Sequence, residues 1–283
     1  PLETDVPARK NVTEVVKATE SIGPMNVLVV DDNEVNVTLM TEMVRRLGHT
    51  ATPARNGKEA VQLAGSRAFD VIFMDFSMPV MDGPEAARRI RTGEGPSAKA
   101  VISGVTALIT ANDDDKAELT SAMDAVLIKP VGQSELEKAL LKYASVRTEE
   151  VQTAIEPAFD LPDDENEDED DGSEIFDDLV LSMGEETGFR LIAATLADAE
   201  LAVAAMEEVG GDLTERAHRI HKAVGSTGMT GMQVLSQTLS AAEVLALDGG
   251  DPSQTHLPRT ARDELARITK IYNHMTHDFV PAG

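Results

Sequence analysis

Four charged side chains stand where apolar stretches of the chain end, and their types suggest phosphate chemistry. They follow three such stretches: Asp31 and Asp32 after residues 26–30, Asp75 after 71–74, and Lys129 after 124–128. If these stretches are neighbouring parallel strands, the charges meet at the carboxyl edge of one sheet, where open α/β sheets bind ligands. Carboxylates that repel one another require a hard cation such as Mg²⁺, which prefers oxygen ligands. A carboxylate beside Mg²⁺ and a lysine is suited to accept a phosphoryl group, and Asp75 is the predicted acceptor.

The elements that must position these residues alternate between strand and helix patterns from residue 26 to about 145. The predicted strands are 26–30, 49–54, 71–74, 100–106 and 124–128. The predicted helices are 34–47, 57–66, 83–92, 112–122 and 134–144. This alternation indicates right-handed βαβ units and a parallel sheet. The expected fold class is α/β plus all-α, with a five-stranded doubly wound parallel sheet of flavodoxin type followed by a small antiparallel helical bundle.

Several motifs in this region share a recognisable order: VVDDNEVN at 29–36, ARNGKEA at 54–60, MDFSMPVMDG at 74–83, Thr106-Ala107, and Lys129-Pro130. Together they resemble the receiver domains of response regulators, especially those attached to hybrid histidine kinases. The resemblance implies that Asp75 is the phospho-acceptor, that Thr106 bonds the phosphoryl group and that Lys129 neutralises it. It also implies the ligands of a Mg²⁺ ion: Asp31, Asp32, Asp75 and the carbonyl of Ser77.

Two positions refine this interpretation. Phosphatases of the haloacid-dehalogenase type also use a strand-end aspartate, but they need a second aspartate two residues later, where this chain has Ser77. Val126 stands three residues before the lysine, where receivers usually carry Tyr or Phe. A valine cannot make the same large swing on phosphorylation. We therefore expect this receiver to act mainly by passing its phosphoryl group onward.

Composition excludes several classes of function. The 283 residues suggest two domains, and the absence of cysteine excludes disulfides, thiol chemistry and cysteine-ligated zinc. A net charge of −25 argues against nucleic acid as a direct partner. No apolar stretch approaches the ~20 residues needed to cross a bilayer, and no signal peptide is recognisable, so no membrane insertion and a cytoplasmic location are expected. Without a glycine-rich nucleotide-binding box, the chain is expected to carry phosphate rather than to act as a complete kinase.

The predicted domains are separated by a strongly acidic stretch. Residues 1–24 are interpreted as a tail or upstream linker, and 25–147 as the receiver domain. Residues 148–172 contain a nearly continuous run of Asp and Glu, which self-repels and cannot bury a core. This segment is predicted to be a flexible linker, and residues 173–283 to be the helical bundle.

The second half has a helical pattern only, and one of its helices carries a stripe of histidine and glycine. The helices are expected around Phe176 and over 185–208, 212–228, 232–247 and 258–278. At ~100° per residue, the third of these aligns four residues on one face: His218, His221, Gly225 and Gly228. Each glycine costs about 1 kcal/mol inside a helix. Close approach of another backbone or of a bulky anion would explain them, and tight helix packing within the bundle explains them equally well.

The segment that follows His221 also resembles a histidine phosphotransfer (HPt) domain, through matches at Gly225, Ser226, Gly228, Gly231, Leu235, Leu239 and Ala242-Glu243-Val244. The resemblance implies that His221 is a second phospho-acceptor, which needs only a neutral, exposed imidazole. Val224 stands where the family usually has lysine, and Lys222 lies off the stripe. His218 is a rival acceptor, but Lys222 occupies its fourth following position in place of glycine.

The favoured function is that of a two-component phosphorelay protein or the C-terminal part of a hybrid sensor histidine kinase. Asp75 would receive phosphate from an upstream sensor histidine kinase, and His221 would deliver it to a downstream response-regulator receiver. In one alternative the pair acts as a phosphate sink, with His221 returning phosphate to Asp75 for hydrolysis. In another, the bundle is a non-catalytic docking module, an interpretation that Val224 keeps open.

Overall fold

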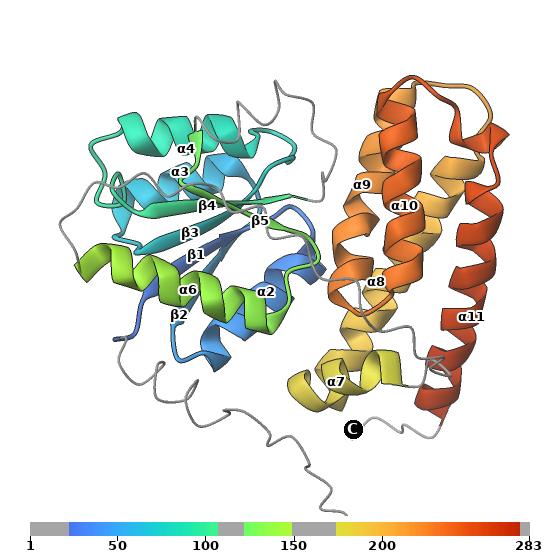
Figure 1. Cartoon of the computed structure of the whole chain (residues 1–283), viewed down its shortest axis with the longest axis horizontal. Coiled ribbons are helices and arrows are strands. Elements are labelled where there is room, and N and C mark those ends of the chain that lie inside the picture. The colour runs from blue at the N-terminus through green and yellow to red at the C-terminus, as the bar shows by residue number, and fades with distance from the viewer. Residues whose placement is uncertain (1–22, 107–121, 149–173, 278–283) are drawn as a thin grey trace, which may run out of the picture.

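A computed structural model describes residues 23–106, 122–148 and 174–277 of the chain. Most of the tail predicted at 1–24, almost all of the helix predicted at 112–122 and almost all of the predicted linker lie outside the described residues. Figure 1 shows two parts side by side, a sheet sandwiched between helices and a bundle of long helices.

The first part contains a five-stranded parallel sheet with the order β2-β1-β3-β4-β5. Its strands are β1 (Asn26–Val30), β2 (Thr50–Ala54), β3 (Val71–Asp75), β4 (Val101–Thr106) and β5 (Ala125–Ile128). The described helices of this part are α2 (Glu34–Arg46), α3 (Gly57–Ser66), α4 (Gly83–Thr92) and α6 (Gln133–Thr148). In this order β1 and β3 are adjacent, and β4 lies between β3 and β5. The strand ends that carry Asp31, Asp75 and Lys129 therefore meet at one edge.

Apolar residues on alternate sides of each strand form two cores, as strand geometry requires. Leu28 and Ile72 pack with buried residues of α3 and α4 on one face. Val29 and Phe73 pack with buried residues of α2 and α6 on the other. The helices accordingly cover the sheet in two pairs (Figure 1). Burial on both faces explains why the central strands β1 and β3 have continuous apolar sequences rather than alternating ones.

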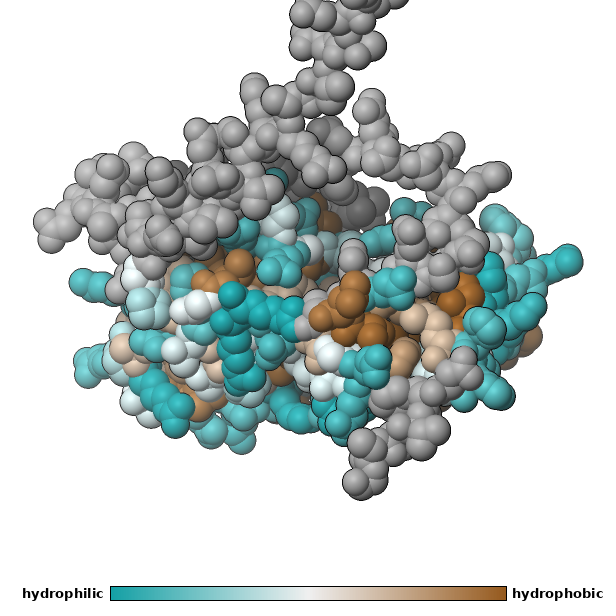
Figure 2. Space-filling view, turned by 90° about the horizontal axis from the view of Figure 1, so that it is seen from below, coloured by the Kyte–Doolittle hydropathy of each residue, from teal (hydrophilic) through white to brown (hydrophobic). Residues whose placement is uncertain are grey.

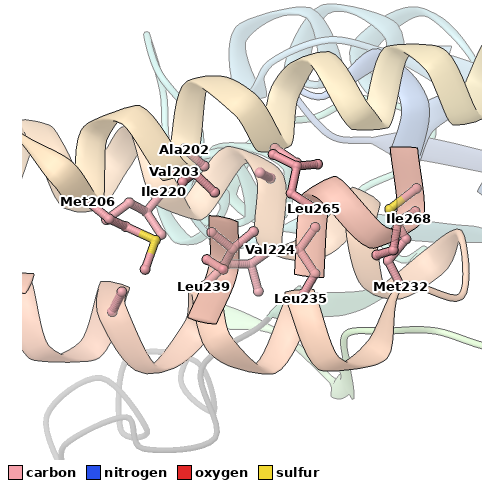
Figure 3. Packing of buried hydrophobic residues seen from close by; sticks show 14 of the residues in the cluster. Ala202, Val203, Met206, Ile220, Val224, Met232, Leu235, Leu239, Leu265 and Ile268 are labelled. Carbon is pink, nitrogen blue, oxygen red and sulfur yellow. The ribbon is translucent and has the colours of Figure 1, made fainter. Parts of the chain in front are cut away.

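The second part consists of α7 (Glu174–Met183), α8 (Glu185–Glu207), α9 (Leu213–Met229), α10 (Gln233–Leu247), the short 3₁₀ helix η1 (Pro252–Gln254) and α11 (Leu257–His277). Short connections join the four long helices, and each of these helices runs antiparallel to the one before it in the chain. Leu235, Leu239, Leu265 and Ile268 meet Val203 and Ile220 in a core that is almost entirely aliphatic (Figure 3). Such a core accounts for a stable bundle in a chain without tryptophan.

Arg216 is the largest fully buried side chain in the described part of the chain. Its guanidinium donates to the carbonyls of Ala205 and Met206 near the end of α8, at 2.9 and 3.2 Å, and to Asp251 at 2.9 Å. Asp251 in turn caps η1. One cation thus joins the ends of three elements, and the sequence patterns contained no indication of it.

The predicted element bounds agree with the described structure within one residue in nearly every case. The main difference is α6, which continues to Thr148 although its predicted end was 144. The apolar spacing that supported the prediction ends at Tyr143 and Ala144, whereas a helix needs no buried residues in its last turn. Among the described helices, none is long and apolar enough to cross a membrane.

The surface is dominated by polar residues, in agreement with the charge of −25. Seen from below (Figure 2), hydrophilic residues cover most of the periphery of both parts, and hydrophobic residues gather near the middle of this face. This is the position of α7 in Figure 1, a helix that carries the exposed Leu181.

Candidate functional site

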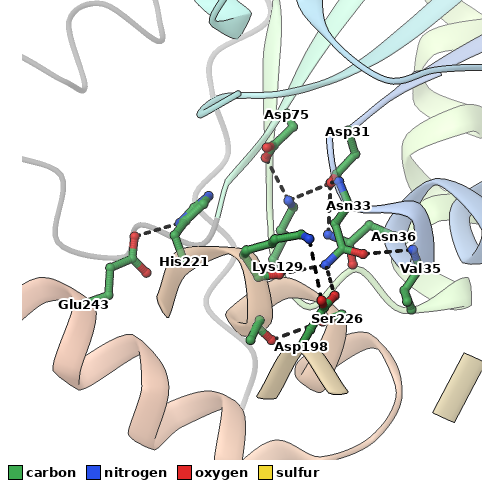
Figure 4. A network of polar contacts seen from close by, with 12 residues as sticks. Asp31, Asn33, Val35, Asn36, Asp75, Lys129, Asp198, His221, Ser226 and Glu243 are labelled. Carbon is green, nitrogen blue, oxygen red and sulfur yellow. Dashed lines mark hydrogen bonds and ion pairs between the residues drawn. The ribbon is translucent and has the colours of Figure 1, made fainter. Parts of the chain in front are cut away.

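The carboxyl edge of the sheet holds a buried ion cluster (Figure 4). Lys129 Nζ lies 2.7 Å from Asp31 Oδ2 and 2.7 Å from Asp75 Oδ1. All three side chains are at least nine-tenths buried. Parallel pairing of β1, β3, β4 and β5 brings the three residues together, although they are up to 98 positions apart in sequence.

Burial and charge act against each other in this cluster. Burial lowers the pKa of Lys129, but the Asp31 and Asp75 carboxylates outweigh it, so the pKa of this ammonium is raised. Burial also raises the pKa of Asp75 above the usual range of an aspartate, and Lys129 offsets only part of that effect. The lysine charge is therefore firmly held, while the Asp75 carboxylate is costly to keep ionised without a further cation.

The same edge offers a suitable set of ligands for a divalent cation. One carboxylate oxygen from each of Asp31, Asp32 and Asp75 lies within 4.8 Å of the other two. Asp75 Oδ2 is buried and has no hydrogen-bond partner among the described atoms. Burial and the neighbouring Asp31 carboxylate raise the pKa of Asp32. Hard oxygen donors, mutual repulsion and an unpartnered buried oxygen fit Mg²⁺.

Two further predicted residues border this cluster. Thr106 is buried at the end of β4, and its carbonyl accepts from the Lys129 backbone N–H at 2.7 Å. Ser77 lies two residues after Asp75, half-buried in the loop between β3 and α4. Thr106 thus contacts the backbone of Lys129, and Ser77 follows the strand that ends in Asp75.

The bundle faces this edge with the second predicted acceptor. His221 on α9 lies across from Asp75 in Figure 4, and the charges of Asp75 and Lys129 both act on its ring. Its side chain is 13% exposed, and Nδ1 is 2.7 Å from Glu243 Oε1 on α10. The expectation of an exposed imidazole was therefore wrong, because Glu243 and the sheet-containing first part surround the ring.

Glu243 controls the protonation of this histidine. Burial lowers the pKa of His221, but the hydrogen bond and charge of Glu243, helped by Asp75, outweigh burial and raise it. An ionised carboxylate can only accept, so in the neutral ring Nδ1 carries the hydrogen and Nε2 keeps its lone pair. Nε2 is thus the nitrogen available for nucleophilic attack.

The other histidine of the stripe is not part of the site. His218 is exposed on α9, with Nδ1 3.1 Å from the Thr214 carbonyl. Lys222 does not substitute for a lysine at position 224, because its Nζ lies 3.6 Å from Asp198 and its side chain is half exposed. Val224 is 5% exposed and contributes to the core of the bundle.

At Gly225 the missing side chain leaves room for the sheet-containing first part, and at Gly228 it leaves room for both this part and helix α10. A Cβ on Gly225 would lie 2.9 Å from Asn36 Nδ2 and 3.1 Å from Lys129 Cδ. A Cβ on Gly228 would lie 3.0 Å from Pro130 Cβ and 3.0 Å from Ser236 Oγ, which belongs to α10. Close approach of the two parts thus accounts for Gly225, and both explanations apply to Gly228.

Three functional candidates escaped the motif analysis. Glu243 stood in a matching segment, but its carboxylate was given no role. Asn33 and Asn36 belong to the first motif; Asn36 Nδ2 donates to both oxygens of Asp31 at 3.1 Å, and Asn33 contacts the bundle. The sequence signal that could have identified Glu243 is a polar residue on an otherwise apolar face of its helix.

Comparison with known proteins agrees with this geometry. Residues 27–141 match the family model described as response regulator receiver domain. The sensor histidine kinase GacS of Pseudomonas protegens is 30% identical over 251 residues, which cover 85% of this chain and 26% of that protein. GacS of Pseudomonas syringae is 30% identical over 236 residues, covering 77% of this chain and 24% of that protein. Both matches are too long to be confined to the first part, so they extend into the bundle.

A solved structure is similar over the first part alone. It is a crystal structure of the receiver domain of sensor histidine kinase PA1611 from Pseudomonas aeruginosa PAO1, with a magnesium ion coordinated in the active-site cleft. It is 34% identical, with a TM-score of 0.40, and the match covers 44% of this chain and 99% of that one. The chain spans between 4% and 26% of the length of the curated relatives it matches.

Proposed function

We propose, from the premise that residues 27–141 form a response regulator receiver domain, that the chain passes a phosphoryl group between Asp75 and His221 as part of a phosphorelay. The single observation that carries this proposal is that His221 faces the buried pair of Asp75 and Lys129, with Gly225 leaving room for the approach. Because hybrid sensor kinases resemble the chain along most of its length, two-component signalling is the context. The bundle then has the role of an HPt domain.

On the receiver side, Asp75 accepts the phosphoryl group through a carboxylate oxygen. Lys129 offsets the negative charge of the phosphoryl oxygens, and Thr106 supplies a hydroxyl at the end of the neighbouring strand. Asp31, Asp32, Asp75 and the Ser77 carbonyl would hold Mg²⁺, which when bound neutralises phosphoryl oxygens. The unpartnered Asp75 Oδ2 supports this assignment.

On the bundle side, His221 is the nucleophile. Its Nε2 lone pair attacks the phosphorus of phospho-Asp75; the N–P bond forms, the bond from phosphorus to the Asp75 oxygen breaks, and the carboxylate is restored. The phosphorylated ring keeps its Nδ1–H and gains positive charge, which the Glu243 carboxylate stabilises at hydrogen-bond distance. The reverse reaction uses the same atoms.

The proposed relay has a source and a destination for the phosphoryl group in other proteins. An upstream sensor histidine kinase supplies the phosphoryl group to Asp75, and a downstream response-regulator receiver takes it from His221. Because transfer between Asp75 and His221 is reversible, the same pair also serves as a phosphate sink when water hydrolyses the acyl phosphate of phospho-Asp75, releasing inorganic phosphate, faster than a downstream receiver is loaded. The relative rates of these two steps decide between relay and sink.

The test uses the full chain with a small-molecule phosphodonor and Mg²⁺. We expect base-labile label on Asp75, followed by acid-labile, base-stable label on His221. The Asp75→Asn variant should take no label, and His221→Gln should retain only the base-labile fraction. His218→Gln is the matched control and should behave as the wild type. Base-labile label that never reaches His221 would reduce the bundle to a docking module.

A further inference from the structure

Asn33 joins the receiver to the bundle while also forming part of the receiver. It is 2% exposed and stands at the start of α2, where its Oδ1 accepts from the Val35 N–H at 2.8 Å. Its Nδ2 donates across the interface to Asp198 Oδ2 at 3.1 Å and to the Lys222 carbonyl at 2.8 Å. Both ends of one amide are therefore used, one within the receiver and one on the bundle.

The two hydrogen-bond acceptors on the bundle fix the position of the receiver relative to helices α8 and α9. Lys222 is the residue next to His221, and Asp198 lies on the neighbouring helix α8, 3.6 Å from Lys222 Nζ. A hydrogen bond to the Lys222 carbonyl therefore positions the turn of α9 that carries the nucleophile. On the receiver, the Asn33 N–H donates to Asp31 Oδ1 at 2.8 Å, which ties the same residue to the ion cluster.

The apolar contacts beside these hydrogen bonds add buried area to the interface, but they do not select one partner over another. Val35 and Leu39 of α2 are buried together with Leu191 of α8. Aliphatic contacts of this kind accept many partners with small changes in shape, whereas a buried donor that lacks its acceptor carries a penalty. The donor of Asn33 and the carboxylate of Asp198 are therefore the discriminating groups of the interface.

The docked receiver also covers the nucleophile. Gly225, one turn after His221, lies so close to Asn36 and Lys129 that even a Cβ would meet them. A second receiver that approaches His221 in line must use this same face of α9. Docking of the chain's own receiver and of another receiver are mutually exclusive.

We propose that Asn33, Asp198 and the Lys222 carbonyl form a docking latch that makes this chain's own receiver the preferred partner of His221, so that a second receiver reaches the histidine only in competition with it. The proposal rests on the proposed function and adds the identity of the partner and the groups that select it.

If Asn33 acts as a latch, one substitution of it should change the rate of transfer between two chains in opposite directions, according to which chain carries it. A residue with only a structural role would not produce this difference. A donor chain carries His221→Gln and phospho-Asp75; an acceptor chain carries Asp75→Asn and an intact His221. Asn33→Ser keeps a good helix cap but is too short to reach the bundle. Placed in the acceptor chain, it should speed transfer between chains roughly tenfold or more, because it removes both hydrogen bonds of the Asn33 amide to the bundle, one of them charge-assisted. Placed in the donor chain, it should slow transfer by a similar factor.

Asp198 provides the matched substitution on the bundle. With Asp198→Ala in the acceptor chain, the difference in transfer rate between donor chains with and without Asn33→Ser should narrow, because only the Lys222 carbonyl remains as an acceptor. Asp198→Asn keeps an acceptor oxygen and should preserve more of the difference. An Asn33→Ser acceptor chain that transfers at an unchanged or slower rate would overturn the latch.

Small-angle X-ray scattering of the full chain separates failure of the latch from failure of the proposed function. Without any phosphodonor, Asn33→Ser and Asp198→Ala should increase the radius of gyration relative to the wild type. If His221 never takes label but these variants expand the chain, the latch stands and phosphotransfer fails. If the dimensions do not change, the latch fails whatever the labelling shows.

Discussion

At the scale of single residues, the contact of His221 with Glu243 sets which ring nitrogen carries the hydrogen. Nδ1 lies 2.7 Å from Glu243 Oε1 and donates to this carboxylate, so Nε2 keeps its lone pair in the neutral ring. The same contact raises the pKa of the ring, together with Asp75 and against the effects of burial and Lys129. The contact with Glu243 therefore affects both the orientation of the His221 ring and its protonation. As the pH falls, more of the rings are protonated and fewer can react.

Glu243→Gln is expected to separate these two effects. Its amide oxygen still accepts from Nδ1–H, but the lost charge lowers the pKa of His221. Transfer from phospho-Asp75 requires the neutral ring, so the transfer rate should rise with pH through the pKa of His221, and the variant should reach half of its maximum at a lower pH. Single-turnover transfer measured across pH checks this. Glu208→Gln, on an exposed pair with Arg219, is the matched control and should leave the profile in place.

The same shift has a consequence for stability. The pKa of His221 in the folded chain lies above the 6.5 of an unfolded histidine. The protonated ring therefore contributes stability that is fully present below pH 6.5 and is lost as the pH rises through the folded pKa. In Glu243→Gln this pH dependence should be weaker, which urea titrations on either side of that range would reveal.

At the scale of elements, one buried cation, the guanidinium of Arg216, holds the end of α8 and the cap of η1. Arg216 satisfies carbonyls near the end of α8 and the Asp251 carboxylate that caps η1. Arg216→Met keeps the volume but leaves these acceptors without their donor, and should cost about 3 kcal/mol or more. Arg219→Met removes an exposed ion pair with Glu208 and should cost less than about 1 kcal/mol. Equal losses in urea unfolding would contradict the assigned role.

Gly225 lowers the stability of helix α9 but allows the receiver to contact this helix closely. Gly225→Ala should stabilise helix α9 by up to about 1 kcal/mol. The added Cβ would nonetheless approach Asn36 and Lys129, so transfer to His221 should slow by about tenfold to a hundredfold. Gly65→Ala in α3 meets nothing within 4 Å, and should stabilise its helix without slowing transfer. Unfolding and single-turnover measurements on both variants provide the comparison.

At the scale of the whole molecule, the sheet part with its two cores and the bundle with its own core share one charged interface. The sheet and the bundle each bury their own apolar residues, and a small seam around Val35, Leu39 and Leu191 joins them. Within the described residues, the clustered carboxylates that could hold a metal ion belong to the receiver. Binding of a divalent cation should therefore stabilise the receiver more than the bundle.

Mg²⁺ is expected to raise the midpoint of one thermal transition and to leave the other nearly in place. At a concentration a hundredfold above its dissociation constant, the ion should stabilise the receiver by about 2.7 kcal/mol. A chelator should reverse the shift, and Asp32→Asn should reduce it. Scanning calorimetry in which both transitions move equally, or in which Asp32→Asn responds as the wild type does, would contradict the assigned ligands.

The sequence by itself determined the parallel sheet and the helical bundle. The order of the strands in the sheet came from the tertiary structure. Apolar runs that end in Asp31, Asp75 and Lys129 nevertheless predict strands with charged residues at their ends, because this pattern is local. Element bounds were predictable for the same reason. The receiver assignment is confirmed for residues 27–141, whereas the phosphoryl roles of Asp75 and His221 stay predictions.

Only the tertiary structure decided which residues meet across long separations. Glu243 lies 22 positions from His221, and Asn33 lies 189 positions from Lys222. No periodicity connects such pairs, since their contact depends on how two helices pack and how two cores dock. For that reason the sequence left Gly225 equally explained by packing inside the bundle and by close approach from outside. The docked receiver, which brings Asn36 and Lys129 against this glycine, resolves the choice.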